Sequence, residues 1–589
     1  MQIPRPEHPN PQWERKNWKN LNGTWQFEID NGLSGEARGL VEAQSLSGTI
    51  TVPFCPEAPL SGVGNKDFMN SVWYKRTEEF TQEQLTGNRV LFHIGACDYE
   101  TKVWINGTLA GVPHKGGYTP VDYDITDLLH PGENLITVCA LDDVRSFRQP
   151  GGKQSALYDS YRCYYTRTTG IWQTVWYEIV PQTYIKYAKL TPDFENCSVL
   201  VDAELCGTGD LSVEVFYEGR KVGQGLKKNK AVTAQMEISL SECHPWEVGH
   251  GRLYDVVLRF GTDEVKSYFG LRSIQMKDGK FLLNGKSVFQ RLILDQGYYP
   301  DGITTAPTEE ALLKDIQLGL MAGFNGARMH QKVFEPRYIY HADRLGYMVW
   351  GEYGNWSMDI TELEAAAIYL PEWLESVRRD YNHPAIIGWC PFNETWDLGH
   401  HIARKVGRRQ NDEVLRIVYR QTKLTDPTRP CIDTSGNFHV ETDIFDVHDY
   451  EQDPAVFKAN YDRLYKENYL HDRFRNDNNL KLSRQIWKGE PVFMSEYGGI
   501  GFKLMENDAE RKVAWSYGKT TTSYEEFYER YEGLTTAILD NPGMFGLCYT
   551  QLTDVEQEKN GLFDYETREP KFDMAIISEI NKRKAVIED

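Results

Sequence analysis

Two glutamates in the C-terminal half of the sequence each stand at the end of a short apolar run. Residues 385–392 lead into Asn393 and Glu394, and residues 491–495 lead into Glu496. A pair of carboxyl groups is what glycoside hydrolysis needs, with one group protonating the leaving oxygen and the other attacking the anomeric carbon. Retaining enzymes hold the two groups about 5 Å apart and inverting enzymes hold them farther apart. The sequence predicts the pair but leaves its separation open.

Further polar residues end the other apolar runs of this half. Glu352 and Asp433 are rival carboxylates for the two roles. Arg328 would keep a nearby nucleophile ionised, although a plain salt bridge to a rim carboxylate is the structural alternative. The remaining candidates are substrate contacts, supports of the catalytic groups or structural residues: Asp295, His330, His448, Tyr450 and Tyr549.

From residue 273 onward, helical patterns alternate with short apolar strands, which is typical of a parallel sheet built from βα units. Strands are predicted at 287–294, 325–329, 348–352, 385–394, 431–434, 444–448, 491–496 and 544–549, and helices at 308–322, 336–345, 371–381 and 412–425. Eight strands predict a (β/α)8 TIM barrel over 273–589, whose strand ends would bring the candidate residues to one rim.

The first 272 residues read as β-structure. Residues 1–182 alternate in period two between turn signals and predict a jelly-roll-like sandwich. Residues 183–272 have the size and alternation of an immunoglobulin-like β-sandwich. Residues 149–167 form a long aromatic and polar loop. Ordering such a loop costs conformational entropy, which only contacts with another surface can offset. We therefore expect it to fold over a neighbouring domain, with the active site as one destination.

Composition limits the partners. The net charge of −20 argues against nucleic acid and anionic membranes. The N-terminal residues contain no signal-peptide h-region, and no apolar run is long enough to span a membrane. The ten cysteines show no framework spacing, so reduced thiols and a cytoplasmic protein are expected. A homo-oligomer is compatible with the sequence, which leaves the oligomeric state open.

Several motifs resemble those of glycoside hydrolase family two, which includes β-galactosidases, β-glucuronidases and β-mannosidases. Residues 380–394 (DYNHPAIIGWCPFNE) resemble the family's acid/base signature. The upstream signature is matched by 324–330 and 343–352, the nucleophile strand by 495–499, and the sugar-binding domain by 116–120, 123–128 and 169–172. The resemblance covers essentially the whole chain in the family's domain order.

The resemblance implies a role for individual residues. Glu394 would be the acid/base and Glu496 the nucleophile, and no metal or organic cofactor is required. Asn393 would bond the 2-hydroxyl of the sugar. Arg328 would orient the nucleophile, and Tyr450 would help to hold it.

Departures from the family pattern bear on the sugar. Glucuronidases of the family hold the substrate carboxylate with an Asn-x-Lys pair, where this chain has Glu558 and Asn560. A carboxylate there would repel a uronate. The usual rim Trp is Tyr549, and Gln331, next to His330, stands where the large β-galactosidases have His. The chain also ends after the barrel, without their further β domains.

These observations predict a retaining exo-β-glycosidase for a carbohydrate substrate, with a β-galactoside as the first choice. An α-L-arabinoside, a β-mannoside and a uronide are alternatives. Trp396 is expected to contact the sugar and Trp389 to lie in the core. Two readings from other classes are a non-catalytic carbohydrate-binding protein and a metal-dependent barrel hydrolase, for which His330 and His448-Asp449 are the only hint of a ligand set.

Overall fold

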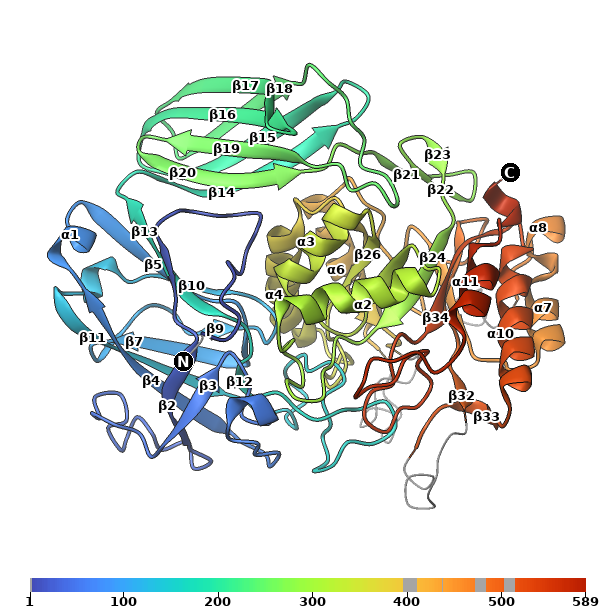
Figure 1. The fold of residues 1–589 in the computed structure, drawn as a ribbon, viewed down its shortest axis with the longest axis horizontal. Helices are drawn as coiled ribbons and strands as arrows, with labels where there is room; N and C mark the ends of the chain where they lie inside the picture. Colours follow the sequence, from blue (N-terminus) through green and yellow to red (C-terminus); the bar gives the residue numbers. More distant parts are fainter. Residues whose placement is uncertain (1–2, 396–409, 437, 472–483, 503–513, 589) are drawn as a thin grey trace.

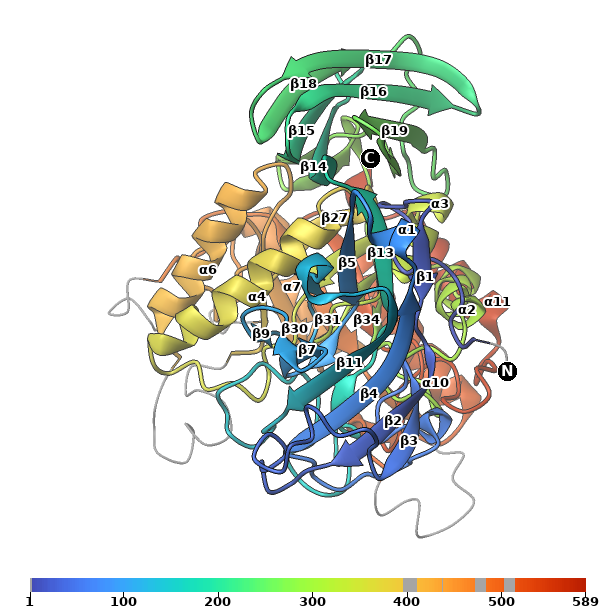
Figure 2. The same cartoon turned by 90° about the vertical axis from the view of Figure 1, so that its left-hand side faces the viewer.

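The computed structural model describes residues 3–395, 410–436, 438–471, 484–502 and 514–588. They form two β-sandwiches and a barrel (Figure 1). The second sandwich lies across the first sandwich and the barrel, and a view turned by 90° shows the first sandwich in front of the barrel (Figure 2).

The N-terminal domain packs two antiparallel sheets face to face. One has the order β1 (Trp18–Asn20), β13 (Val175–Pro181), β5 (Asn88–Ile94), β10 (Val121–Asp124). The other runs β3 (Gly48–Val52), β2 (Gly23–Ile29), β4 (Ser71–Phe80), β11 (Gly132–Leu141), β7 (Glu100–Ile105), β8 (Thr108–Leu109), with β9 (His114–Lys115) also paired to β7. Helix α1 (Gln82–Leu85) and the pair β6 (Cys97–Asp98) and β12 (Gly170–Ile171) complete it. Alternate side chains such as Phe92 and Val138 fill the core, as period-two patterning requires.

The second domain is an immunoglobulin-like sandwich. Its sheets are β14 (Tyr184–Asp193), β15 (Ser198–Cys206), β18 (Thr233–Ser239) and β17 (Arg220–Asn229), β16 (Gly209–Tyr217), β19 (Tyr254–Phe260), β20 (Asp263–Phe269). In β16, Leu211, Val213 and Val215 are fully buried and the residues between them are partly exposed. The fold class predicted for both β domains is confirmed.

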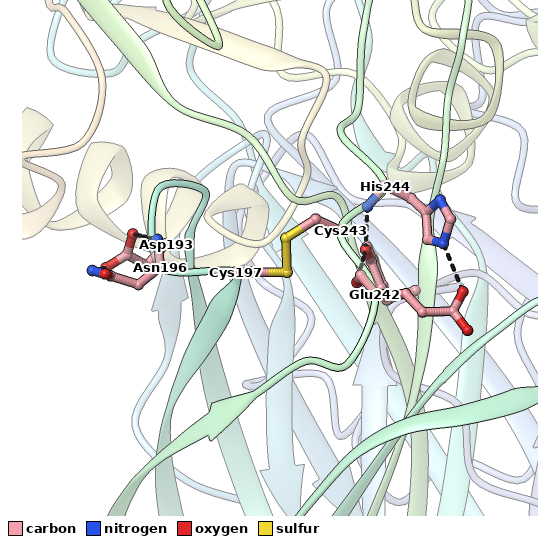
Figure 3. Close-up of a disulfide and its surroundings, with 7 residues drawn as sticks. Asp193, Asn196, Cys197, Glu242, Cys243 and His244 are labelled. Atoms are coloured by element: carbon pink, nitrogen blue, oxygen red, sulfur yellow. Dashed lines mark hydrogen bonds and ion pairs between the residues drawn. A yellow bond between two sulfur atoms is a disulfide. The ribbon is translucent and has the colours of Figure 1, made fainter.

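One expectation about the cysteines is wrong. Cys197 and Cys243 form a disulfide, with their Cα atoms 5.7 Å apart, and join the turn before β15 to the segment after β18 (Figure 3). Because β15 pairs with β18, the two residues meet in space although 46 positions separate them. Sequence spacing carries no trace of this pairing. The cytoplasmic location stays a prediction, and the disulfide removes one of the arguments for it, because that argument assumed reduced cysteines.

The C-terminal domain is the predicted TIM barrel. Seven strands form one parallel sheet in the order β27 (Ile386–Cys390), β26 (Met348–Glu352), β25 (Gly326–Met329), β24 (Gln290–Asp295), β34 (Met544–Thr550), β31 (Val492–Gly498), β30 (Phe445–Asp449). A short parallel pair, β28 (Phe392–Asn393) and β29 (Thr434–Ser435), occupies the remaining position. The predicted fourth strand is therefore divided, and Pro391, which has no N–H to donate, stands at the division.

Helices connect the strands and cover the barrel. They are α2 (Glu309–Met321), α3 (Pro336–Leu345), α4 (Glu364–Asp380), α6 (Asp412–Thr425), α7 (Pro454–Tyr461), α8 (Arg463–Glu467), α10 (Tyr524–Leu539) and α11 (Met574–Lys582). The bounds of α3 and α6 match the prediction, whereas α4 begins seven residues before Pro371, the predicted start. A small sheet, β21 (Ile274–Lys277), β22 (Lys280–Leu283), β23 (Lys286–Ser287), precedes the barrel, and β32 (Ile500–Phe502) pairs with β33 (Tyr517–Thr521).

The N-terminal segment joins all three domains. Arg15 donates to Glu178 of the first domain at 2.7 Å and to Asp263 of the second at 2.9 Å. Arg5 donates to Glu335, just before α3 of the barrel, at 2.8 Å. These buried ion pairs hold the domains in register, so residues of the first domain can contribute to a site at the barrel rim.

Among the described residues, no helix combines the length and apolar character that crossing a membrane requires.

Candidate active site

Glu394 lies just after β28 at the C-terminal rim of the barrel. Its N–H donates to the carbonyl of Ser435 in β29 at 2.8 Å. Its backbone has a φ of 46°, in the left-handed region that residues with a side chain rarely adopt. Such strain persists only where the surroundings hold it, and it occurs often at functional sites. The side chain is 16% exposed, so the carboxyl group is accessible from the rim.

Glu496, in β31, is buried in a cluster of donors. Its Oε1 is 3.1 Å from Arg328 Nη1, and its Oε2 accepts from the Tyr450 hydroxyl at 2.6 Å. Burial by itself raises the pKa of Glu496, but the charges of His448, Arg328 and His330 and the Tyr450 bond outweigh it and leave the pKa lowered. The carboxylate is therefore held in its ionised form, as a nucleophile must be.

Arg328 is fixed by a second carboxylate. Its Nε donates to Glu352 Oε1, and its Nη1 also donates to the carbonyl of Ser495 at 2.8 Å. Glu352 Oε2 is 3.1 Å from His330 Nδ1. Glu352, predicted as a rival catalytic carboxylate, is thus buried, with one oxygen bound to the Arg328 guanidinium and the other beside the His330 imidazole. Glu352 therefore supports the Arg328 guanidinium, which faces Glu496.

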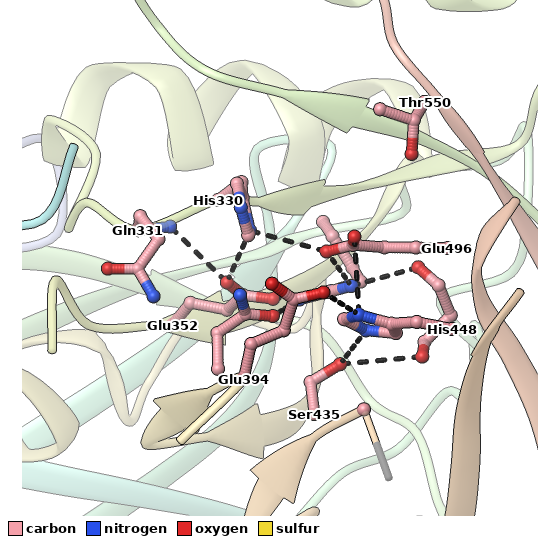
Figure 4. Close-up of polar contacts among 12 residues, drawn as sticks. His330, Gln331, Glu352, Glu394, Ser435, His448, Glu496 and Thr550 are labelled. Atoms are coloured by element: carbon pink, nitrogen blue, oxygen red, sulfur yellow. Dashed lines mark hydrogen bonds and ion pairs between the residues drawn. The ribbon is translucent and has the colours of Figure 1, made fainter. Parts of the chain in front are cut away.

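His448 lies between the two predicted catalytic carboxylates (Figure 4). Its Nδ1 is 2.7 Å from Glu394 Oε1 and 3.3 Å from Glu496 Oε2, and its Nε2 is 2.8 Å from the Ser435 hydroxyl. Burial alone would lower the pKa of His448, but the charges of Glu496 and Glu394 raise it above its usual value. The raised pKa shifts His448 toward its protonated form, whose positive charge offsets the repulsion between the two carboxylates.

The two carboxyl groups are close together. Oxygen atoms of Glu394 and Glu496 and the nearer nitrogen of His448 all lie within 4.8 Å of one another. An adjoining cavity of about 770 Å³ is lined by Glu394, His448 and Tyr450 together with residues 449, 451–452, 436, 438 and 518–519. This volume lies within the range of small-molecule sites. The geometry meets the separation that a retaining mechanism requires.

Asn393 presents an unused donor to the same region. Its Oδ1 accepts from Arg328 Nη2 at 3.0 Å, which fixes the orientation of the amide. Its Nδ2 is buried and has no hydrogen-bond partner among the residues described. The carbonyl of Asn393 accepts from Trp356 Nε1 at 3.0 Å and Asn355 Nδ2 at 3.1 Å. A buried amide donor without a partner is costly unless a ligand uses it.

The loop 149–167 of the N-terminal domain reaches this rim. The N–H groups of Gly151 and Gly152 donate to the carbonyls of Trp356 and Gly354, each at 3.0 Å. A Cβ on Gly152, whose φ is 59°, would lie 2.4 Å from the carbonyl oxygen of Gln331, so only glycine permits this approach. Further along the loop, the Tyr165 hydroxyl donates to Glu558 in the segment after β34. The loop thus packs on the barrel domain, on the segment that holds Gly354 and Trp356 and on the segment after β34.

Two predicted residues lie away from the carboxylate pair. Asp295 faces helix α3, where it accepts from the Tyr338 hydroxyl at 3.2 Å. Tyr549 is fully buried, with its ring centroid 4.9 Å from that of Tyr531 in α10. The next residue, Thr550, faces the barrel interior, where its hydroxyl contacts Tyr450. Because side chains alternate along a strand, Tyr549 points to the opposite face, toward the helices. Tyr549 is therefore no stacking platform in this structure.

Predictions for three further residues have different outcomes. Asp433 is buried and accepts from the backbone N–H of Val440 at 2.6 Å, and its other oxygen is 2.8 Å from His439 Nδ1, so it is a structural carboxylate. Trp396 lies outside the described residues. Trp389 is buried, as expected, and its Nε1 donates to Asp426 at 2.7 Å.

Sequence reasoning missed the network behind His448. Asp446 Oδ2 accepts from the Ser435 hydroxyl at 2.5 Å, and Asp446 Oδ1 is 3.2 Å from His439 Nε2. Burial lowers the pKa of His439, but hydrogen bonds and charges of Asp433 and Asp446 dominate and raise it to about 10. Tyr517 was also missed; its ring stacks on Tyr450 at a centroid distance of 3.4 Å. Asp446, two positions before His448 on β30, was the one signal available, since it shares a strand face with that residue.

Models of one family match along the chain. The sugar-binding domain of glycosyl hydrolases family 2 matches residues 18–175, a second family 2 model matches 183–272, and its TIM barrel domain matches 274–503. The chain therefore belongs to glycoside hydrolase family 2 and is a glycosidase.

The relatives that are similar in sequence to this chain are named for different activities. A β-glucuronidase of Streptococcus agalactiae is 23% identical over 96% of this chain and 96% of its own length. A β-galactosidase of Leuconostoc mesenteroides is 25% identical over 70% of this chain, which spans only 42% of that relative. Among solved structures, a β-glucuronidase of an uncultured Clostridium has a TM-score of 0.77 at 19% identity, covering 97% of this chain and 99% of its own. At that identity the likeness shows the fold alone.

Proposed function

We propose that this protein is a retaining exo-β-glycosidase in which Glu496 is the nucleophile and Glu394 the acid/base. The observation that carries the proposal is the pair of carboxyl groups whose oxygen atoms lie within 4.8 Å. That spacing leaves no room for a water molecule between the second carboxylate and the anomeric carbon, which an inverting mechanism needs.

The environments of the two groups fit their different tasks. Glu496 is buried, and its depressed pKa keeps it ionised for attack on the anomeric carbon. Glu394 is at the accessible side, where it protonates the departing oxygen and then deprotonates the water that hydrolyses the glycosyl-enzyme. The free Nδ2 of Asn393 is placed to donate to the 2-hydroxyl, a bond that strengthens in the transition state.

For the sugar, we propose a neutral hexopyranoside, with a β-galactoside as first choice. Glu558 is fully buried and lies 3.9 Å from Lys153 of loop 149–167. The carboxylate of a uronide substrate would be repelled by the Glu558 carboxylate if it were bound beside it. The relatives named β-glucuronidases make a uronide the competing candidate, and an α-L-arabinoside and a β-mannoside are the neutral alternatives.

The test uses purified protein and a panel of nitrophenyl glycosides. We expect hydrolysis of at least one neutral β-glycoside, with the β-anomer of the free sugar formed first by NMR. A 2-deoxy-2-fluoro analogue of the accepted substrate should become attached to the peptide that contains Glu496, as mass spectrometry can show.

The variant Glu496→Gln should lose roughly 10⁵-fold in kcat, as expected when the nucleophile of a concerted site is removed. Replacing Glu525, an exposed first-turn residue of α10, by Gln is the matched control. A wild-type protein inactive on the entire panel, or a Glu496→Gln variant of undiminished activity, would refute the proposal.

A metal-dependent hydrolase is the alternative for which the structure offers a specific group. Glu394, His448 and Glu496 have the spacing of a metal site. However, the raised pKa of His448 favours the imidazolium, which cannot ligate a metal. Activity that survives exhaustive chelation would eliminate this alternative.

A further inference from the structure

The hydroxyl of Ser435 is the point from which the protons around His448 can be counted. Asp446 Oδ2 accepts from the Ser435 hydroxyl at 2.5 Å and also from the Ser495 hydroxyl. Burial raises the pKa of Asp446, but the hydrogen bond and the positive charge of His439 outweigh it and leave the pKa lowered. An ionised carboxylate has no proton to donate, so the single hydroxyl proton of Ser435 lies on the bond to Asp446.

This direction determines which nitrogen of His448 carries a proton. His448 Nε2 is 2.8 Å from the Ser435 oxygen, which is within hydrogen-bond length. Because the proton of Ser435 lies on the bond to Asp446, the Ser435 oxygen accepts at this contact. Nε2 is therefore a donor, and it carries a proton in either charge state of the imidazole.

The other nitrogen of His448 faces the proposed acid/base. His448 Nδ1 is 2.7 Å from Glu394 Oε1 (Figure 4), and among the described side chains His448 alone forms a hydrogen bond with the Glu394 carboxyl group. Two lone pairs would repel each other at this distance, so a proton lies between the two atoms. Either both groups are neutral, or Glu394 is ionised and His448 is an imidazolium. In both cases the pair holds one proton on this bond and has no net charge.

The surroundings favour His448 as the site of this proton in the resting enzyme. Burial lowers the pKa of His448, but the charges of Glu496 and Glu394 outweigh it and raise the pKa. Glu496 Oε2 is 3.3 Å from the same Nδ1. The other titratable groups that act on His448 are Asp446, Arg328, Glu352 and His330. Arg328 and Glu352 are bonded to each other, so their charges largely cancel at the imidazole.

Resting on the proposed function, we infer that His448 is the proton partner of the acid/base: the proton that reaches the leaving oxygen is stored on His448 Nδ1 and is delivered through Glu394. In the first half of the reaction, the bond between the anomeric carbon and the leaving oxygen breaks. Its electron pair stays on that oxygen, which binds the proton of the pair, and Glu496 forms the new bond to the anomeric carbon. In the second half, water attacks that carbon, the electron pair of the glycosyl–Glu496 bond returns to Glu496, and the proton released by water restores the pair.

Sharing the proton makes the pair a stronger base in the second half. Once the proton has left, the lone pair of His448 Nδ1 faces the ionised Oε1 of Glu394 at short distance. This repulsion favours the recapture of a proton, which is the task of the general base when water attacks. The pair therefore loses its proton at a higher pH than an isolated carboxyl group at the same place would, and the enzyme stays active to higher pH.

The experiment measures kcat/KM against pH for the phenyl and 2,4-dinitrophenyl glycosides of the accepted sugar, with EDTA present. For the wild-type protein, the phenyl glycoside should show a basic limb where the pair loses its proton. The dinitrophenyl glycoside should show this limb only weakly, because its leaving group departs without a proton. In His448→Gln, the basic limb on the phenyl glycoside should move to lower pH by about one to two units.

A second variant keeps the imidazole and changes only its support. Ser435→Ala removes the acceptor of Nε2, so the basic limb should move in the same direction by a smaller amount. His250→Gln, a change of an exposed histidine in the second domain, is the matched control and should keep the wild-type limb. Tm values identify a variant that has not folded, and the remaining variant then decides the question.

The outcomes separate this inference from the proposed function. A basic limb that stays in place in the active variants, or that moves to higher pH, would overturn the shared proton and leave the two-carboxylate mechanism intact. An equal wild-type basic limb on both substrates would do the same, because it would assign the limb to a group other than the acid. Inactivity of the wild-type protein on every glycoside, or unchanged activity in Glu496→Gln, would contradict the mechanism itself.

Discussion

The two sides of the candidate site are built differently. On the nucleophile side, Glu496, Arg328 and Glu352 come from the ends of three strands of one barrel sheet, and Arg328 forms hydrogen bonds with both carboxylates. Where loop 149–167 meets the segment after β34, Lys153 and Glu558 come from different domains and stand 3.9 Å apart. Groups that are already paired are preorganised, so they can stabilise the charge of a reacting atom without first rearranging. The contrast teaches that one cluster of buried charges is built within a single domain, whereas the other depends on the docking of two domains.

The largest effect that tests this contrast belongs to the acid/base. Glu394→Gln should lower kcat/KM, which reports the step that releases the leaving group, roughly 10²- to 10⁴-fold on a phenyl glycoside, because the leaving oxygen is no longer protonated. The loss should be much smaller for a dinitrophenyl glycoside, which departs without a proton. Steady-state kinetics on the two substrates measure the difference, and Glu413→Gln, in the exposed first turn of α6, is the control. Equal losses on both substrates would remove Glu394 from the acid role.

A pH profile sharpens the electrostatic side of the comparison. The pKa of Glu496 is depressed, so the wild-type nucleophile loses its charge only when the pH falls below the usual range of a glutamate. His448 is the leading cause of that depression. In His448→Gln, the pKa of Glu496 should rise and the acid limb of kcat/KM should move to higher pH.

The control for this profile is His130→Gln, a change of an exposed histidine in the N-terminal domain. An acid limb that stays in place, or that moves to lower pH, would mean that His448 does not hold the nucleophile in its ionised form. The same shift in the control variant would assign the effect to the protein's overall charge.

The smallest effect is expected where loop 149–167 meets the segment after β34. Tyr165→Phe removes one donor to Glu558, which keeps its contact with Asn560. A single hydrogen bond is worth about 1 kcal/mol, so kcat/KM should fall by roughly fivefold with little change in the acid limb. Tyr158→Phe, on the exposed part of the loop, is the control. A loss as large as that of Glu394→Gln would show that this contact takes part in catalysis and not in selection alone.

Much of the framework follows from local sequence. The strand ends that carry Arg328, Glu352 and Glu496 were predicted because apolar runs of strand length end in polar residues, and the bounds of α3 and α6 follow from helical periodicity. Domain order and fold class also follow, since period two and period 3.6 separate the β domains from the barrel.

What the sequence by itself determined is therefore the kinds of elements, their order and the carboxylates at the strand ends, because these depend on neighbours along the chain. The tertiary structure alone decided the 4.8 Å spacing of the carboxyl groups, the place of His448 between them and the burial of Tyr549 behind its strand. It also decided the Cys197–Cys243 pairing and the arrival of Lys153 from another domain. These contacts join residues far apart in sequence, and only the packing of whole sheets and domains brings such residues together.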